Sequence, residues 1–258
     1  MIFMRNALLL AICCCGMATA ADAPYAGKWK MNVARSDFGD TTMTYEQVPG
    51  DGLRFTADGL SYNFKTDGKD NMTPWGFTMA WKEGNNGSWE TVERTNGKVT
   101  ATSTVSISSD DKTLTIKTKR VKADGKTSDD AMVFQRVSGG PGLVGKWKTK
   151  NLKTSSPETL TLTPKGNNGV VILLGNEGAS CDARFDGKDY PATGSMWPAG
   201  WTCLVTKSGA RGIDLTWKKD GKDMYKSTLT ASTDGKVLTE IGSAAGANEQ
   251  FKVVYERH

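Results

Sequence analysis

The hydrophobic and polar positions along this chain follow a period of two. Short runs rich in Thr, Val and aromatic residues are separated every eight to twelve residues by turns such as Asp67-Gly68, Asn96-Gly97, Asp186-Gly187 and Asp234-Gly235. Such dipeptides supply the positive φ angles that tight hairpins need. No window of twelve or more residues has helical periodicity. The pattern predicts an all-β chain in which consecutive strands pair as an antiparallel meander.

The alternation also indicates which side chains face the interior. Phe77, Met79 and Trp81 alternate with small, polar or charged residues, and Trp201 and Cys203 do the same in a later segment. Successive side chains of a strand point to opposite faces, so one apolar set defines one buried face. We therefore expect these five side chains to point inward.

Three short motifs occur twice in the same order, about 120 residues apart. The first copies are Gly27-Lys28-Trp29-Lys30, Asp67-Gly68-Lys69-Asp70 and Val133-Phe134-Gln135-Arg136, and the second are Gly145-Lys146-Trp147-Lys148, Asp186-Gly187-Lys188-Asp189 and Val254-Tyr255-Glu256-Arg257. A repeat of this length is a whole domain. We expect two tandem antiparallel meander β-barrels of about nine strands each, at residues 21–137 and 145–258, with a short linker at 138–144.

The first twenty residues resemble a secretory signal peptide. Arg5 precedes the short apolar run 7–15, and Ala18-Thr19-Ala20 is a small-x-small cleavage site. The run is too short to span a bilayer. We expect an exported, periplasmic or extracellular protein that does not span a membrane. The alternative is a lipoprotein anchored through one of Cys13, Cys14 and Cys15, but no small residue immediately precedes Cys13.

The formal net charge is +5, and the excess of basic residues lies in the second repeat. These residues are spread along strand-like segments without the clustering and exposed aromatics of a nucleic-acid groove, so we expect no nucleic-acid partner. Two cysteines follow the signal peptide, Cys181 and Cys203. Because both fall on the inward face of predicted strands in an exported protein, we expect a disulfide bond between them.

The two Gly-Lys-Trp-Lys strands and the closing Val254-Tyr255-Glu256-Arg257 resemble strands of the calycin superfamily, which contains lipocalins, fatty-acid-binding proteins and bacterial lipocalin-like proteins. The resemblance also extends to secreted bacterial proteins of unassigned function built from such repeats. It implies lipocalin-like barrels whose Gly-x-Trp tryptophan closes one barrel end. It does not imply a fatty-acid site. The Arg-x-Tyr carboxylate clamp is missing, since Met132 and Val253 occupy the arginine position, and no helix pair follows the first strand.

Catalytic chemistry has little support. The only histidine is His258, so neither a Ser-His-Asp arrangement nor a histidine metal site can form. Nearly all carboxylates stand in turns or on outward positions. We expect no catalytic residue, metal or cofactor, and the alternative, an isomerase-type enzyme with a barrel cavity, has no acid or base that the sequence identifies.

The aromatic residues are the better candidates for a site. Phe77, Met79, Trp81, Trp201 and Trp217 are predicted to face inward, and Trp75 and Trp197 to lie near the barrel rims after the Asp-Gly-Lys-Asp turns. The ordinary explanation for the inward residues is a packed core. If the barrels are hollow, we expect a non-catalytic binding protein for a small apolar or aromatic ligand. The alternative is a cell-envelope module that recognises polysaccharide or a protein partner through exposed Trp75 and Trp197.

Overall fold

The computed structural model describes residues 23–38, 41–247 and 249–258, so the expected signal peptide lies outside the described residues. The described chain is all-β, as predicted, with twenty strands and two 3-10 helices, η1 (Val33–Arg35) and η2 (Asn85–Gly87). No helix in the described chain could span a bilayer, because each lacks the necessary length and hydropathy.

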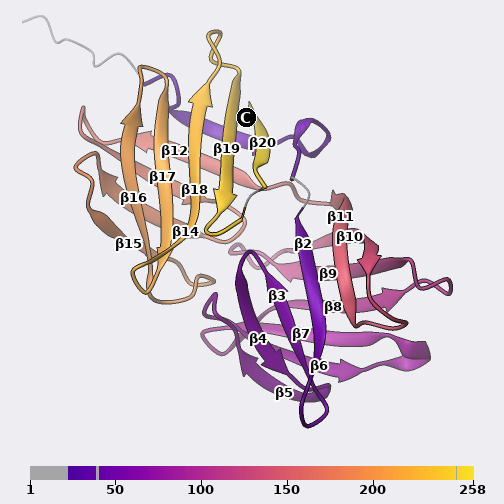
Figure 1. The fold of residues 1–258 in the computed structure, drawn as a ribbon. Coiled ribbons are helices and arrows are strands. Elements are labelled where there is room, and N and C mark those ends of the chain that lie inside the picture. Colours follow the sequence, from indigo (N-terminus) through magenta and orange to yellow (C-terminus); the bar gives the residue numbers. More distant parts are fainter. Residues whose placement is uncertain (1–22, 39–40, 248) are drawn as a thin grey trace, which may run out of the picture.

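The strands form two antiparallel sheets of ten strands, one more in each than the sequence indicated (Figure 1). The closed barrel consists of β1 (Gly27–Met31), β12 (Thr159–Pro164), β13 (Gly169–Leu174), β14 (Ala179–Arg184), β15 (Asp189–Thr193), β16 (Trp201–Ser208), β17 (Gly212–Lys219), β18 (Lys222–Ala231), β19 (Val237–Ala244) and β20 (Phe251–Arg257). The second sheet, called the open barrel because its edge strands β4 and β5 do not pair, consists of β2 (Thr42–Val48), β3 (Gly52–Ala57), β4 (Leu60–Phe64), β5 (Asp67–Met72), β6 (Thr78–Glu83), β7 (Trp89–Thr95), β8 (Lys98–Ile107), β9 (Thr113–Val121), β10 (Thr127–Ser138) and β11 (Gly145–Thr154).

The boundaries of the two sheets differ from those of the sequence repeat. Strand β1 of the first repeat pairs with β12 and β20 of the second, and β11 of the second repeat pairs with β2 and β10 of the first. All strands of the open barrel therefore lie in one continuous segment, 42–154. The closed barrel is assembled from the chain on either side of that segment.

The short connection 139–144 accounts for this arrangement. It joins β10 to β11 as a hairpin, and a short connection between two strands favours antiparallel neighbours. The residues expected to separate two domains therefore form a turn within one sheet. With β11 paired to β10, the corresponding position in the closed barrel is filled by β1, which carries the same Gly-Lys-Trp-Lys motif.

A matching Trp–Arg contact closes one end of each barrel. The guanidinium of Arg257 lies 4.4 Å from the Trp29 ring centroid, and that of Arg136 lies 4.0 Å from the Trp147 centroid. Both indoles are completely buried. A Cβ on Gly27, whose φ is +140°, would lie 2.5 Å from the Arg257 guanidinium. The positive φ therefore favours glycine in the Gly-x-Trp motif, and a side chain there would also displace the arginine that covers the tryptophan.

The closed barrel is filled by its own side chains. Its inward residues form one cluster in which Leu162, Ile172, Ile213, Leu229 and Leu238 are each less than 2% exposed. Side chains of an interior of this kind leave few voids. The open barrel has a smaller buried cluster around Tyr45, Leu114 and Trp147, at the end closed by Arg136.

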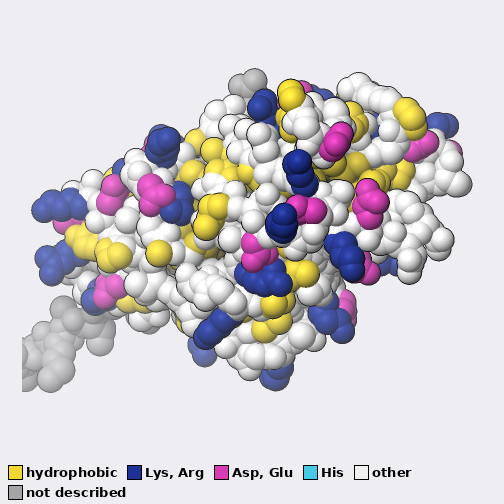
Figure 2. Space-filling model, turned by 90° about the horizontal axis from the view of Figure 1, so that it is seen from below, with side chains coloured by type: hydrophobic (Ala, Val, Ile, Leu, Met, Phe, Trp, Pro, Cys, Tyr) yellow, Lys and Arg dark blue, Asp and Glu magenta, His cyan; other side chains and the backbone are white. Residues whose placement is uncertain are grey.

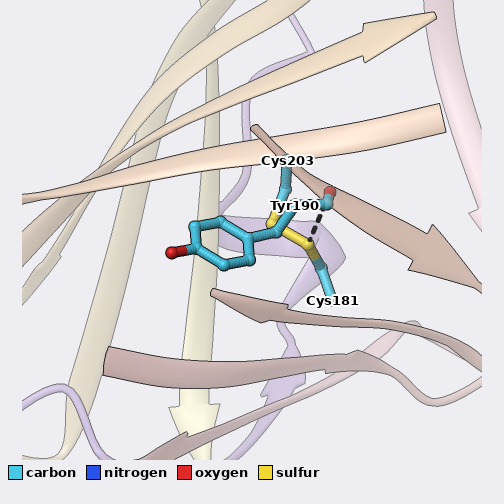
Figure 3. The surroundings of a disulfide bond; sticks show 3 residues. All are labelled: Cys181, Tyr190 and Cys203. Atoms are coloured by element: carbon cyan, nitrogen blue, oxygen red, sulfur yellow. Dashed lines mark hydrogen bonds between the residues drawn. A yellow bond between two sulfur atoms is a disulfide. The ribbon is translucent and has the colours of Figure 1, made fainter. Parts of the chain in front are cut away.

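The predicted disulfide between Cys181 and Cys203 is present (Figure 3). The two strands are not adjacent, because β15 lies between β14 and β16. The bond therefore crosses the inner side of β15, where Cys181 Sγ lies 3.4 Å from the carbonyl oxygen of Tyr190. It links β14 to β16 and contacts β15 between them. A disulfide is compatible with an exported protein.

Candidate functional site

The open barrel encloses a cavity of about 760 Å³. Side chains from nine of its ten strands line it, together with residues from the closed barrel at its mouth. The wall is mainly apolar and includes ten aromatic side chains, among them Tyr45, Phe55, Tyr62, Phe77 and Trp81. A cavity of this size with a mainly apolar wall is typical of small-molecule sites.

Four of the candidate residues line this cavity from the first repeat: Trp75, Phe77, Met79 and Trp81. Trp81 is held by a hydrogen bond from its Nε1 to the Tyr62 hydroxyl at 3.1 Å and stacks on Phe64, with ring centroids 4.6 Å apart. The alternation in β6 thus identified part of the wall.

Trp75 reaches the cavity from a tight turn between β5 and β6. Thr73 closes the turn, because its backbone amide donates to the carbonyl of Phe77 at 2.9 Å. This geometry stacks the Trp75 ring on Phe77, with centroids 6.0 Å apart and an interplanar angle of 13°. Trp75 also packs against the core of the closed barrel, so it joins the two barrels.

Trp197 and Trp201 line the same cavity, although they come from the other repeat. Trp201 Nε1 donates to the Trp75 carbonyl at 3.0 Å, and Asn96 Nδ2 donates to the Trp197 carbonyl at 3.2 Å. The repeat places both residues in a barrel of their own, at residues 145–258. Instead, loop 194–200 of the closed barrel forms part of the mouth of the open barrel.

Two expectations about the tryptophans need correction. Trp217 does not line the cavity; it packs against Trp197, with ring centroids 5.9 Å apart, beside the filled core of the closed barrel. Trp75 and Trp197 lie in turns beside the cavity, but they are half-buried between the barrels and not exposed. The physical reason is the docking of the barrels, which covers the turns that carry these side chains.

The cavity also contains charged groups that sequence reasoning missed. Arg120 of β9 lies 3.5 Å from Glu93 of β7, whose Oε1 also accepts a hydrogen bond from Thr100 Oγ1 at 2.7 Å. Asp58, in the β3–β4 turn, accepts a hydrogen bond from the hydroxyl of Tyr225 at 3.3 Å. Burial raises the pKa of Asp58.

Glu177 approaches the cavity from the β13–β14 turn of the closed barrel. The turn is fixed to the open barrel, because the Ala123 amide donates to the Asn176 carbonyl at 2.8 Å. Burial, and then the neighbouring Glu158, raise the pKa of Glu177 from its ordinary 4.5 to about 7. The sequence Gly175-Asn176-Glu177-Gly178 indicated only a turn, so nothing in it identified this carboxyl group.

In the part of the chain that the structure describes, no group of three His, Cys, Asp or Glu side chains is placed to hold a metal ion. On the face seen in Figure 2, basic and acidic side chains are interspersed. A scan against protein-family models finds no match, and searches of curated proteins and of solved structures find none either. The barrel-like sheets are compatible with a calycin-like fold.

Proposed function

We propose that this chain is an exported, non-catalytic binding protein of lipocalin-like architecture that holds a small apolar or aromatic ligand in the open-barrel cavity. The observation that carries the proposal is the shared cavity of Trp75, Phe77, Met79, Trp81, Trp197 and Trp201. The exported location and the tandem repeat rest on the sequence motifs and belong to the same proposal.

Burial of apolar surface supplies the affinity. At about 25 cal/mol per Å², a ligand that buries about 250 Å² of apolar surface gains roughly 6 kcal/mol before the entropic cost of binding. The aromatic wall is largely preformed, since Trp75, Phe77 and Trp81 are each held by ring contacts within the barrel.

The proposal assigns one ligand site to each chain. The repeat suggested two equivalent sites, but the interior of the closed barrel is occupied by its own buried side chains. The closed barrel instead contributes loop 194–200 and the β13–β14 turn to the mouth of the cavity. We expect native mass spectrometry of the protein from its own host to show a retained small molecule at one copy per chain.

Tryptophan fluorescence tests which residues make the contact. Titration with 1-naphthylmethanol, a small aromatic probe, should quench the emission, and Trp75→Phe should remove a large part of the quenching because the ring lies in the wall. Trp217→Phe is the matched control. It removes a candidate tryptophan that lies outside the cavity, so the quenching should persist.

Two results would contradict the proposal. A set of lipids, quinones and aromatic probes that gives neither quenching nor a mass shift would mean that the cavity is not a ligand site. Equal loss of quenching in Trp75→Phe and Trp217→Phe would mean that the emission reports a general structural change instead of contact in the cavity.

A further inference from the structure

The cavity of the open barrel has more acidic than basic groups in its wall. Its charged residues are Asp58, Glu93, Glu177 and Arg120, and they come from four different elements. The wall therefore contains three carboxyl groups and one guanidinium within a largely apolar enclosure. Charges in such surroundings interact more strongly than in water, so the imbalance affects what the cavity can hold.

Arg120 does not offset the excess, because it already has two acidic partners. Its guanidinium lies 3.5 Å from Glu93 and 3.8 Å from Asp130 of β10. One oxygen of Asp130 is buried without a hydrogen bond, so this acid depends on Arg120 for its stabilisation. An anionic ligand would have to compete with both carboxylates for the same guanidinium.

Of the three carboxyl groups in the cavity wall, Glu177 is the least stabilised by hydrogen bonds or cations. The groups that act on it are Glu158 beside it, Glu93 and Arg120 across the cavity, and the phenols of Tyr225 and Tyr255. None of them hydrogen-bonds to its carboxylate. The Glu158 carboxylate, by contrast, accepts hydrogen bonds from the amides of Thr159 and Asn176 at 2.8 and 2.9 Å.

Aromatic faces adjoin these acids. Trp201 stacks on Tyr225, with ring centroids 6.4 Å apart and an interplanar angle of 7°, and the Tyr225 hydroxyl contacts Asp58. The faces of Trp and Tyr rings attract organic cations as well as apolar groups. The same wall can therefore accommodate a positively charged group and its hydrophobic body.

We propose that the open-barrel cavity selects a small organic cation, an ammonium group carried on an aromatic or aliphatic body. The ammonium group would lie near Glu177, and the body would lie against the aromatic wall. This inference rests on the proposed binding function and makes it more specific, because it names the charge of the ligand.

The experiment compares three probes that share a naphthylmethyl body: trimethyl(1-naphthylmethyl)ammonium, 1-naphthylmethanol and 1-naphthylacetate. Affinities are measured at pH 8 by fluorescence quenching and by calorimetry. We expect the ammonium to bind at least tenfold more tightly than the alcohol, and the carboxylate to bind most weakly. The quaternary ammonium has no titratable proton, so any pH dependence belongs to the protein.

Glu177→Gln should reduce the preference for the ammonium over the alcohol by about tenfold while leaving the affinity for the alcohol nearly unchanged. Glu46→Gln is the matched control, because Glu46 lies exposed on β2 and outside the cavity. It makes the same change in net charge and should not alter the preference. In the unmodified protein the preference should grow between pH 6 and pH 8 as Glu177 loses its proton.

The outcomes separate the two proposals. Equal affinity for the ammonium and the alcohol would overturn the selection of cations but leave the binding function intact. Tighter binding of the carboxylate would also overturn it and would identify Arg120 as the anchor. If none of the three probes binds, the proposed function itself fails.

Discussion

Position 177 carries a carboxyl group that burial keeps partly protonated near neutral pH. Its folded-state pKa, about 7, lies above the ordinary value of 4.5. Between these two values the folded chain binds more protons at this position than the unfolded chain does. The free energy of unfolding therefore receives a contribution from Glu177 that falls as the pH rises through this range.

Glu177→Gln tests this sign. Relative to the Gln variant, the protein should lose on the order of 2 kcal/mol of unfolding free energy between pH 5 and pH 8, after allowance for partial solvent exposure of the side chain. Urea unfolding of both proteins at several pH values measures the difference. Because acids distant from Glu177 titrate alike in both proteins, a constant difference across this range would contradict the raised pKa.

The sequence predicted the direction of a side chain well where the alternation along a strand determines it. Phe77, Met79 and Trp81 were identified because they share one face of a strand whose interior side is apolar. Trp217 also points inward, but alternation does not distinguish a filled interior from a hollow one. Glu177 was missed because its Gly-flanked turn has the composition of any surface turn, and only docking of the barrels buries it.

At the scale of elements, β15 is held on its inner side by the Cys181–Cys203 disulfide. It is one of the shorter strands of the closed barrel and pairs through few residues with each neighbour. The loop that follows it carries Met196, Trp197 and Pro198 to the cavity mouth. The disulfide therefore stabilises the strand that leads into this part of the candidate site.

Removal of this bond by the double substitution Cys181→Ala and Cys203→Ala should lower the free energy of unfolding by about 3 kcal/mol, because the bridge spans 22 residues of chain. Chemical denaturation with and without a reducing agent measures this loss of unfolding free energy. The reductant should destabilise the unmodified protein and leave the double variant unchanged. A double variant as stable as the oxidised protein would show that the strands hold β15 without the bond.

Pairing between elements was only partly predictable. The spacing of the turns predicted the meander, because two consecutive strands joined by a tight turn pair with each other. The repeat then suggested that each barrel takes its own Gly-Lys-Trp-Lys strand. The observed pairing differs because both strands carry the same motif, and the motif therefore does not specify which barrel each strand joins. The six residues between β10 and β11 were the available signal, since a connection that short forms a hairpin.

At the scale of the whole molecule, one barrel is inserted into the other. Residues 42–154 contain all strands of the open barrel, and the closed barrel consists of β1 and β12–β20. The candidate site depends on both, because the wall belongs to the inserted barrel and part of the mouth to the other. This dependence could not be predicted from the sequence, which shows strands but not the contacts between finished barrels.

A polypeptide of residues 41–154 should fold cooperatively, whereas one of residues 23–138 should not, since it lacks the β11 strand that brings Trp147 against Arg136. Thermal unfolding followed by circular dichroism distinguishes the two. Residues 41–154 should also bind the naphthyl probes more weakly than the full chain, because Trp197 and Trp201 are absent. A cooperative transition in 23–138 alone would contradict the insertion.

The pairing of β1 with β12 and β20 has a consequence for folding during synthesis. Trp29 lies opposite Leu160 of β12 on one side and Arg257 of β20 on the other, so β1 is paired on both edges only after β20 has been made. The inserted barrel can complete its own sheet well before that time. Contacts between such distant positions form slowly, because a long loop must close first. One edge of β1 therefore stays unpaired until β20 is complete, and the closed barrel closes after the barrel that is inserted into it.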